Sequence, residues 1–302
     1  MLGAALRTVA LTVLVCSCVG AAAAQPEPGA ADTSGTTTTT ASTPDVAVTD
    51  RDRVWANFTR EAAVVGENRF WVELRGMILQ TGNFPTLGLN GYPVRDFEKQ
   101  TGKTVENIDG GRFDLIGAYG LGKMGEIGID LPFVMQQQIE FTDGSFQNDA
   151  NVGDLVLYGK FMQQLAQDWN GAVGMELSAP TGPVDEMLGS GDLGLNPFLS
   201  TRYQSGRVGV GGHLGFLFNT GSQPQVFNWS VEFLARANKQ LALRTEVSGR
   251  LFNDDGTIND ISIWPGFDFN LTDYFIIRPQ GLVHATDDAI NWGIGIGFVV
   301  TM

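Results

Sequence analysis

The sequence GMELSAPTGPVDEMLGSGDLGLNPFLS, residues Gly174–Ser200, alternates apolar and polar side chains on both sides of an interruption rich in Pro and Gly. Met175 and Leu177 flank Glu176, and the alternation resumes at Leu193 after the break. Successive side chains of a β-strand point to opposite faces, so this pattern predicts two half-buried strands joined by a loop. The pattern alone leaves open which of the two faces is in contact with water.

The same alternation extends from about residue 69 to the C-terminus and divides into twelve candidate strands. One face of every candidate strand is apolar, rich in Leu, Ile, Val and Phe, and carries no charged residue. This is the period of two that is typical of strands with one apolar face. The twelve stretches are 70–74, 113–121, 127–133, 155–161, 173–177, 193–203, 208–218, 227–233, 241–251, 261–269, 275–283 and 292–302.

The opposite face of these strands carries eight acidic and seven basic residues, with Gly, Ser and Asn between them. If this face lines the lumen of a barrel, its charged residues are the candidate lumen-lining residues. They are Glu73, Arg75, Asp114, Glu126, Asp130, Lys160, Glu176, Arg202, Glu232, Arg236, Arg244, Glu246, Arg250, Asp268 and Arg278. We interpret Arg236, Arg244 and Arg250 as a selectivity patch, because Glu232 and Glu246 lie within diagonal reach on neighbouring strands.

Three features predict that the apolar face points to lipid. Connections alternate in length: the long ones are 80–111, 137–151 and 182–192, and the short ones are 122–125, 204–207 and 272–273. Long extracellular loops and short periplasmic turns are typical of membrane barrels. Aromatic residues gather near both ends of the apolar faces, as they do at lipid interfaces. The polar face carries one Lys, Lys160, which favours an enclosed lumen over a water-exposed surface.

These observations predict an all-β fold, a transmembrane antiparallel up-and-down β-barrel of about 12 strands over residues 69–302. An even number of strands places both chain ends beside the short turns. A closed barrel also pairs every backbone group of the wall, which lipid requires. The predicted partner is therefore a lipid bilayer, and the oligomeric state stays open.

The N-terminus predicts export to the outer membrane of a Gram-negative-type cell. Residues 1–24 combine Arg7, an apolar stretch and small residues before a cleavage site, as signal peptides do. Residues 25–68 begin with a Thr-, Ala- and Pro-rich stretch and are predicted to be a disordered leader and linker. Both cysteines, Cys16 and Cys18, fall in the signal peptide, and lipid modification of Cys18 is an open alternative.

Composition excludes other classes of protein. The 302 residues include 19 Lys and Arg against 33 Asp and Glu, a formal net charge of -14. Without a basic stripe to meet phosphates, a nucleic-acid partner is not expected. After the signal peptide, no apolar run approaches the roughly 18 residues of a membrane-spanning helix.

Candidate catalytic and metal-binding residues are few. The two histidines, His213 and His284, fall on the polar face of separate strands, with no cluster of metal ligands around them. The acidic loops contain four aspartates whose spacing does not match the twelve-residue calcium loop: Asp185, Asp192, Asp254 and Asp255. The sequence GVGGHLG lies in a strand with no following helix, so it does not predict a phosphate site. We therefore assign no catalytic residue, no cofactor, no metal and no enzyme activity.

Four short motifs resemble those of a family of outer-membrane proteins associated with the meta-pathway of phenol degradation. They are VGDLVLYGKF (Val152–Phe161), GAVGMELSAPTG, GSGDLGLNPFLS and the hairpin YGLGKMGEIGIDLPFV. The family has a GDL…K strand, an apolar strand ending in PTG and a GSG…D loop, and the similarity covers residues 110–302. The resemblance implies a transporter-like β-barrel for small solutes, with aromatic or other hydrophobic compounds among the candidate substrates. It brings no catalytic residues.

Three functions from different classes fit such a barrel: a small-solute channel, a plugged structural or adhesive barrel that binds partners through its loops, and an outer-membrane enzyme. Barrels of about eight strands are filled by side chains and those of about 16 to 18 leave a channel, so about 12 strands leave the first two open. The connection 80–111 includes a predicted helical turn at RDFEKQTG and is long enough to fold inward. Phe84 and Tyr92 in this connection are the predicted contacts of an aromatic solute.

Overall fold

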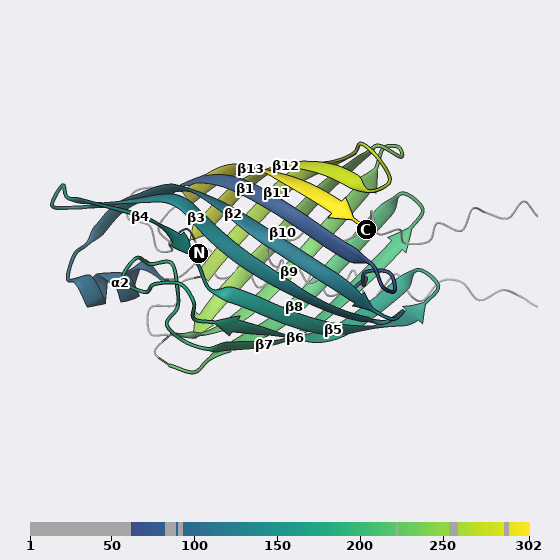
Figure 1. Cartoon of the computed structure of the whole chain (residues 1–302), viewed down its shortest axis with the longest axis horizontal. Helices are drawn as coiled ribbons and strands as arrows, with labels where there is room; N and C mark the ends of the chain where they lie inside the picture. Colours follow the sequence, from purple (N-terminus) through teal and green to yellow (C-terminus); the bar gives the residue numbers. More distant parts are fainter. Residues whose placement is uncertain (1–61, 82–88, 90–92, 222, 254–258, 287–289) are drawn as a thin grey trace, which may run out of the picture. The chain divides into compact units, whose positions relative to one another are not determined.

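The computed structural model describes residues 62–81, 89, 93–221, 223–253, 259–286 and 290–302 (Figure 1). They form thirteen strands and one helix, α2 (Val94–Thr101). The strands are β1 (Phe70–Gln80), β2 (Val105–Leu121), β3 (Gly125–Phe141), β4 (Phe146–Val152), β5 (Leu155–Ala166), β6 (Trp169–Ala179), β7 (Gly194–Ser205), β8 (Val208–Asn219), β9 (Gln225–Arg236), β10 (Leu241–Asn253), β11 (Asn259–Asn270), β12 (Phe275–Thr286) and β13 (Ile290–Thr301). Among the described residues, no helix has both the length and the apolar character needed to cross a membrane.

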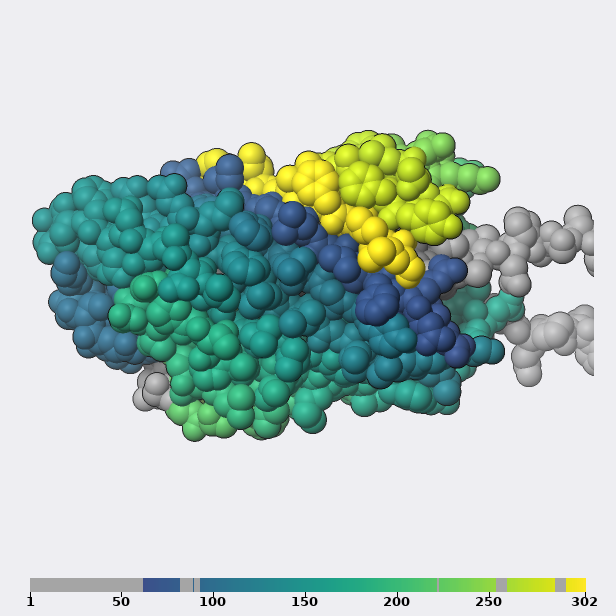
Figure 2. Space-filling view, in the orientation of Figure 1, coloured from purple at the N-terminus to yellow at the C-terminus, as the bar shows by residue number. Residues whose placement is uncertain are grey.

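Twelve of the strands close into a ring. β1 pairs with both β2 and β13, β2 pairs with β3, β3 pairs with β5, and the strands from β5 to β13 pair in chain order. The thirteenth strand, β4, pairs only with β3 among the described strands. In Figure 2 the blue β1 lies beside the yellow C-terminal strand, where the ring closes. The predicted fold class and strand number are therefore confirmed: the protein is an antiparallel up-and-down barrel.

The apolar face of the wall points outward and the charged face points inward. Leu199 and Ile294 are 61% and 58% exposed, whereas Glu73 and Arg244 are each 1% exposed. Exposed apolar side chains occur on every strand of the ring, which is far more than a monomer in water presents. An apolar outer surface of this extent is typical of a barrel that is surrounded by lipid.

Two of the predicted long connections are partly strand. β2 begins at Val105 and β3 extends to Phe141, so the connections predicted at 80–111 and 137–151 are shorter in the structure. The missed strand β4 has the mostly polar sequence FQNDANV, and it pairs with the far end of β3 outside the ring. The predicted helical turn is confirmed as α2, which ends at Gly102 in the left-handed conformation, with φ of 69°.

At the long-loop end, β2 and β3 form a hydrophobic core with α2 and the β6–β7 connection. Its buried residues, which we call the long-loop cap, are Leu89, Val94, Phe97, Val105, Ile108, Val134, Ile139, Phe141, Met187 and Leu188. Asp154 holds the β6–β7 connection, because its carboxylate accepts hydrogen bonds from the backbone N–H of Gly182 at 3.0 Å and of Ser190 at 2.7 Å. Burial raises the pKa of Asp149 on β4, and the nearby carboxylate of Glu186 adds to the effect.

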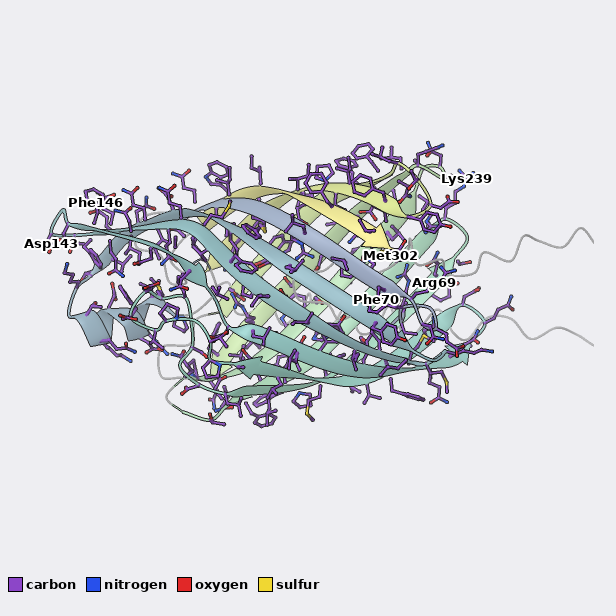
Figure 3. All side chains as sticks on the ribbon, viewed as in Figure 1. Arg69, Phe70, Asp143, Phe146, Lys239 and Met302 are labelled. Atoms are coloured by element: carbon purple, nitrogen blue, oxygen red, sulfur yellow. The ribbon has the colours of Figure 1, made fainter. Side chains whose placement is uncertain are left out.

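The two ends of the barrel can be distinguished by labelling, since Asp143 and Lys239 lie at opposite ends (Figure 3). Both are exposed. Because we expect the long-loop end to be extracellular, Asp143→Cys should react with a membrane-impermeant maleimide on intact cells. Lys239→Cys should react only after the outer membrane is permeabilised, and the reverse pattern would contradict the predicted orientation. The native cysteines lie in the predicted signal peptide and should not interfere.

Candidate functional site

A row of alternating charges crosses the lumen wall near the short-turn end. Asp268 bridges two arginines through its two oxygens, Arg244 Nε at 2.7 Å and Arg278 Nε at 3.0 Å. Arg244 also reaches Glu232, with 2.7 Å between Nη1 and Oε1. The whole row is buried, so each charge depends on its partners for solvation. We call it the ion-pair belt, and it consists of Arg75, Glu73, Arg278, Asp268, Arg244 and Glu232.

A glycine on β13 makes the belt continuous from β12 to β1. Gly297 stands next to Arg278 in the register, and Arg278 Nη1 reaches across β13 to Glu73 Oε2 at 3.2 Å. Glu73 Oε1 accepts a further bond from Arg75 Nε at 3.2 Å. A Cβ atom at Gly297 would lie 2.6 Å from Glu73 Oε1. The absence of a side chain at Gly297 leaves room for the pair across β13.

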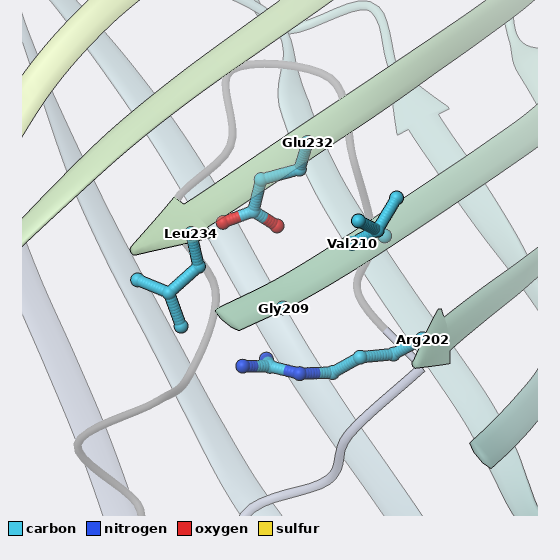
Figure 4. Close-up of a pocket in the computed structure, with 6 residues that line it drawn as sticks. Arg202, Gly209, Val210, Glu232 and Leu234 are labelled. Atoms are coloured by element: carbon cyan, nitrogen blue, oxygen red, sulfur yellow. The ribbon is translucent and has the colours of Figure 1, made fainter. Parts of the chain in front are cut away.

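A shallow recess continues the belt onto β7, β8 and β9 (Figure 4). Arg202 and Glu232 approach it from the strands on either side of β8, and both face Gly211 in the register. Arg202 Nη2 donates to Gln204 Oε1 at 2.7 Å. The recess is lined by Arg202, Gly209, Val210, Gly211, Glu232 and Leu234. Because glycines form its floor, a cation and an anion are presented together over the backbone of β8.

Residues 62–66, the N-terminal segment, lie inside the ring at the short-turn end. Ala63 and Val65 are 2% and 1% exposed. The Nζ atom of Lys160 donates to the carbonyl oxygen of Ala63 at 2.6 Å, and the backbone N–H of Val65 donates to Glu126 Oε2 at 2.7 Å. Lys160 and Glu126 also pair with each other at 3.4 Å. The sequence places these residues in the linker 25–68, whose boundaries stay a prediction.

The N-terminal segment also packs against apolar side chains of the wall. Val65 belongs to a buried cluster at this end of the lumen, formed by Val65, Trp71, Ile116, Ala118, Tyr158, Ile276 and Val299. Gly120 makes the closest approach, since a Cβ atom there would lie 2.2 Å from the carbonyl oxygen of Gly66. The segment therefore narrows the lumen at the short-turn end.

A second apolar cluster lies on the lumen wall above the belt. Met77, Trp264 and Leu282 are 6%, 6% and 7% exposed and pack together, with Leu79 against them. β13 separates β12 from β1 at this height, and its inward-facing Gly293 is the register partner of both Leu79 and Leu282. The absent side chain lets the cluster form across β13. We call these four residues the apolar lumen patch.

A chain of hydrogen bonds joins four polar residues on β6, β7, β9 and β8. The Nδ2 atom of Asn196 donates to Glu176 Oε2 at 2.6 Å, and the Nδ2 atom of Asn228 donates to Asn196 Oδ1 at 3.3 Å. The Nε2 atom of His213 lies 3.1 Å from Asn228 Oδ1. Since Asn228 Oδ1 can only accept, His213 carries a proton on Nε2. This chain links one carboxylate, two amides and one imidazole on one side of the lumen.

The structure places all fifteen predicted charges of the polar face at buried or half-buried positions. The buried ones are Glu73, Arg75, Asp114, Glu126, Lys160, Arg202, Glu232, Arg244, Glu246, Asp268 and Arg278. The half-buried ones are Asp130, Glu176, Arg236 and Arg250. The predicted contacts of an aromatic solute, Phe84 and Tyr92, lie outside the described residues, as do Asp254 and Asp255.

The predicted selectivity patch is not one cluster. Arg244 belongs to the ion-pair belt, whereas Arg250 lies six residues further along β10, which corresponds to about 20 Å. Arg250 pairs instead with Asp260 of β11, with 2.7 Å between Nε and Oδ2. Arg236 is at the short-turn end of β9. Register, and not closeness in sequence, decided these pairings.

Sequence reasoning missed several lumen residues. Arg112, which pairs with Asp114 at 2.6 Å, escaped notice because a register shift between Gly111 and Arg112 disturbs the alternation of β2. Trp264 and Leu282 could have been found, because they are apolar residues at positions whose parity is that of the polar face.

The histidines lie far apart in the register. His213 is hydrogen-bonded to Asn228. His284 Nε2 lies 3.4 Å from Asp260 Oδ2. Within the part of the chain that the structure describes, no group of three or more His, Cys, Asp or Glu residues could hold a metal ion.

The fold of this chain is similar to those of known barrel proteins. No family model matches the chain, and no curated protein matches it. An outer membrane channel from Pseudomonas putida F1 is similar over 83% of this chain and 100% of its own, with a TM-score of 0.62 and 13% identity. The NanC porin is similar over 76% of this chain and 98% of its own, with a TM-score of 0.50 and 10% identity. The resemblance to the phenol-degradation family is not confirmed, and what these similarities show is a barrel fold shared with an outer membrane channel and a porin.

Proposed function

We propose that the protein is a channel for small solutes in the outer membrane of a Gram-negative-type cell, exported by the signal peptide predicted at residues 1–24. The observation that carries the proposal is the closed ring of twelve strands with apolar side chains outside and charged side chains inside. A wall of this polarity suits lipid on one side and a polar path on the other. The fold shared with an outer membrane channel supports the same function.

Small aromatic or other hydrophobic compounds are the proposed substrates. The apolar lumen patch supports this class, because it places an indole ring and aliphatic side chains on the lumen wall beside the charged belt. The motif resemblance points to the same class. Contact of the solute with Phe84 and Tyr92 stays a prediction.

Conductance of the purified protein in planar bilayers tests the proposal. We expect discrete current steps from protein that has folded, as judged by heat-modifiable migration in a gel. Folded protein that inserts but never conducts, in the wild type or in the variant described below, would contradict the channel function.

A second candidate function is a plugged barrel that binds partners through its extracellular loops. The N-terminal segment favours it, because residues 62–66 are hydrogen-bonded to Lys160 and Glu126 inside the ring. A channel requires that the N-terminal segment can move out of the lumen, whereas a plugged barrel requires that it stays there.

Gly120→Ala should loosen the N-terminal segment and raise the conductance. The added Cβ would lie 2.2 Å from the carbonyl oxygen of Gly66 and 2.4 Å from that of Val65, and these backbone atoms can move only with the segment. Overpacking costs about 1 to 3 kcal/mol, so the population with the segment displaced should rise about fivefold or more. Gly159→Ala is the control, because its Cβ would meet no atom closer than 3.9 Å. Equal conductance of wild type and Gly120→Ala would contradict a constriction at this segment.

A further inference from the structure

Gln280 stands at the boundary between the ion-pair belt and the apolar lumen patch. On the inward face of β12 it lies between Arg278, a member of the belt, and Leu282, a member of the patch. Its register partners on both sides are glycines, Gly266 of β11 and Gly295 of β13. The amide therefore has no neighbouring side chain in its own row of the wall.

The Gln280 side chain is buried, and its amide nitrogen is unsatisfied. It is 7% exposed, and its Nε2 atom has no hydrogen-bond partner among the described residues. Buried polar atoms in folded proteins almost always have a partner, so an orphaned amide on a lumen wall points to a group that arrives from outside the chain. A primary amide can donate two hydrogen bonds and accept two.

The amide and the patch converge on the same strip of β13. A Cβ atom at Gly295 would lie 2.9 Å from Met77 Cγ and 3.5 Å from Gln280 Cγ, so both side chains lean over this glycine. Trp264 is two residues from Gly266, the partner of Gln280, and on the same face. An indole ring, a thioether and an amide thus border one strip of the wall.

We propose that Gln280 and the apolar lumen patch form a binding site for a neutral aromatic solute that carries one hydrogen-bonding oxygen. The ring lies against Trp264, Met77 and Leu282, and the oxygen bonds to the Gln280 amide. The solute is neutral because the charged residues beside the site already interact within the protein. Arg278 is bonded to Glu73 and Asp268, and Glu246, the buried register partner of Trp264, also has a partner. Gln280 is then the residue that determines specificity, since a hydrocarbon of the same shape leaves the amide unpaired. This inference specifies the substrate class of the proposed channel and rests on that function only for how the solute reaches the site.

Binding can be measured without conduction. The probes are 4-fluorobenzyl alcohol and 4-fluorotoluene, followed by ¹⁹F NMR with the folded protein in lipid nanodiscs, and empty nanodiscs correct for partition into lipid. Loss of one hydrogen bond should weaken binding of the alcohol to Gln280→Leu by about three- to tenfold and leave binding of the toluene unchanged. Trp264→Ala should weaken the binding of both probes.

Ser248→Ala is the matched control. Ser248 is 2% exposed on the inward face of β10, and its hydroxyl also has no hydrogen-bond partner in the described part of the chain, but it is not a member of the patch. It should leave the affinity of both probes unchanged. Equal affinity of the alcohol for wild type and Gln280→Leu, with both folded, would overturn the inference. Selective binding of the alcohol by a barrel that never conducts would support this site and contradict the channel function. Conduction without selective binding would support the channel function and contradict this site.

Discussion

Asp268→Asn should lower the free energy of unfolding by about 3 to 5 kcal/mol, because breaking a buried ion pair leaves an uncompensated charge. The carboxylate of Asp268 lies between Arg244 and Arg278, at 2.7 and 3.0 Å, and the residue is 1% exposed. A neutral amide in its place leaves two buried guanidinium groups with one negative charge fewer. Unfolding by guanidinium chloride in lipid vesicles measures the loss.

Asp273→Asn is the control for this change, because the same chemical substitution falls on an exposed turn between β11 and β12. It should change stability little. Adding Arg278→Met to Asp268→Asn should recover part of the loss, because the ion-pair belt then again holds equal numbers of cations and anions. A loss below about 1 kcal/mol for Asp268→Asn alone would show that the belt is not what stabilises this part of the wall.

Val231→Arg should lower the free energy of unfolding by about 2 to 4 kcal/mol, the cost of a cation on the lipid face near the middle of the bilayer. Val231 is on the outward face in the middle of β9 and lies between Val247 of β10 and Gly212 of β8 in the register. Neither neighbour offers a counter-charge. The same unfolding measurement and heat-modifiable migration score the result.

Ser205→Arg controls for the chemistry of the new side chain, since Ser205 is exposed at the end of β7, where a short turn follows. An arginine there can keep its charge in water. Equal tolerance of arginine at both positions would contradict the assignment of the apolar face to lipid.

The sequence was sufficient to predict the ring and the direction of its two faces. Met175 is 53% exposed and Lys160, on the neighbouring strand, is 6% exposed, as the alternation predicts. A shift of one residue in a wall strand would place charge in lipid, so the period of two is strictly kept there. β4 was not predicted because its sequence is mostly polar, and a strand outside the ring does not need a continuous apolar face.

The residues of the site were easier to predict than their contacts. Parity alone marked Arg244 and Arg250 as inward-facing, but their partners depend on strand register and on which neighbours are glycine. Arg250 pairs with Asp260 and not with Glu246, which lies on its own strand. The N-terminal segment could not have been placed, because the short apolar sequence AAVVG has no period that would distinguish a plug from a linker.

The pair between Glu73 and Arg278 joins residues 205 positions apart and spans β13 from one side to the other. Such a contact cannot form until β1 and β13 have met. The pairing of β1 with β13 has the greatest sequence separation in the ring, so its loop-closure entropy is the largest and we expect it to form late in assembly. Before β1 pairs with β13, the carboxylate of Glu73 and the guanidinium of Arg278 are apart. Pairing of these two strands brings the two charges together in one step, so we expect separation of β1 from β13 to be slow.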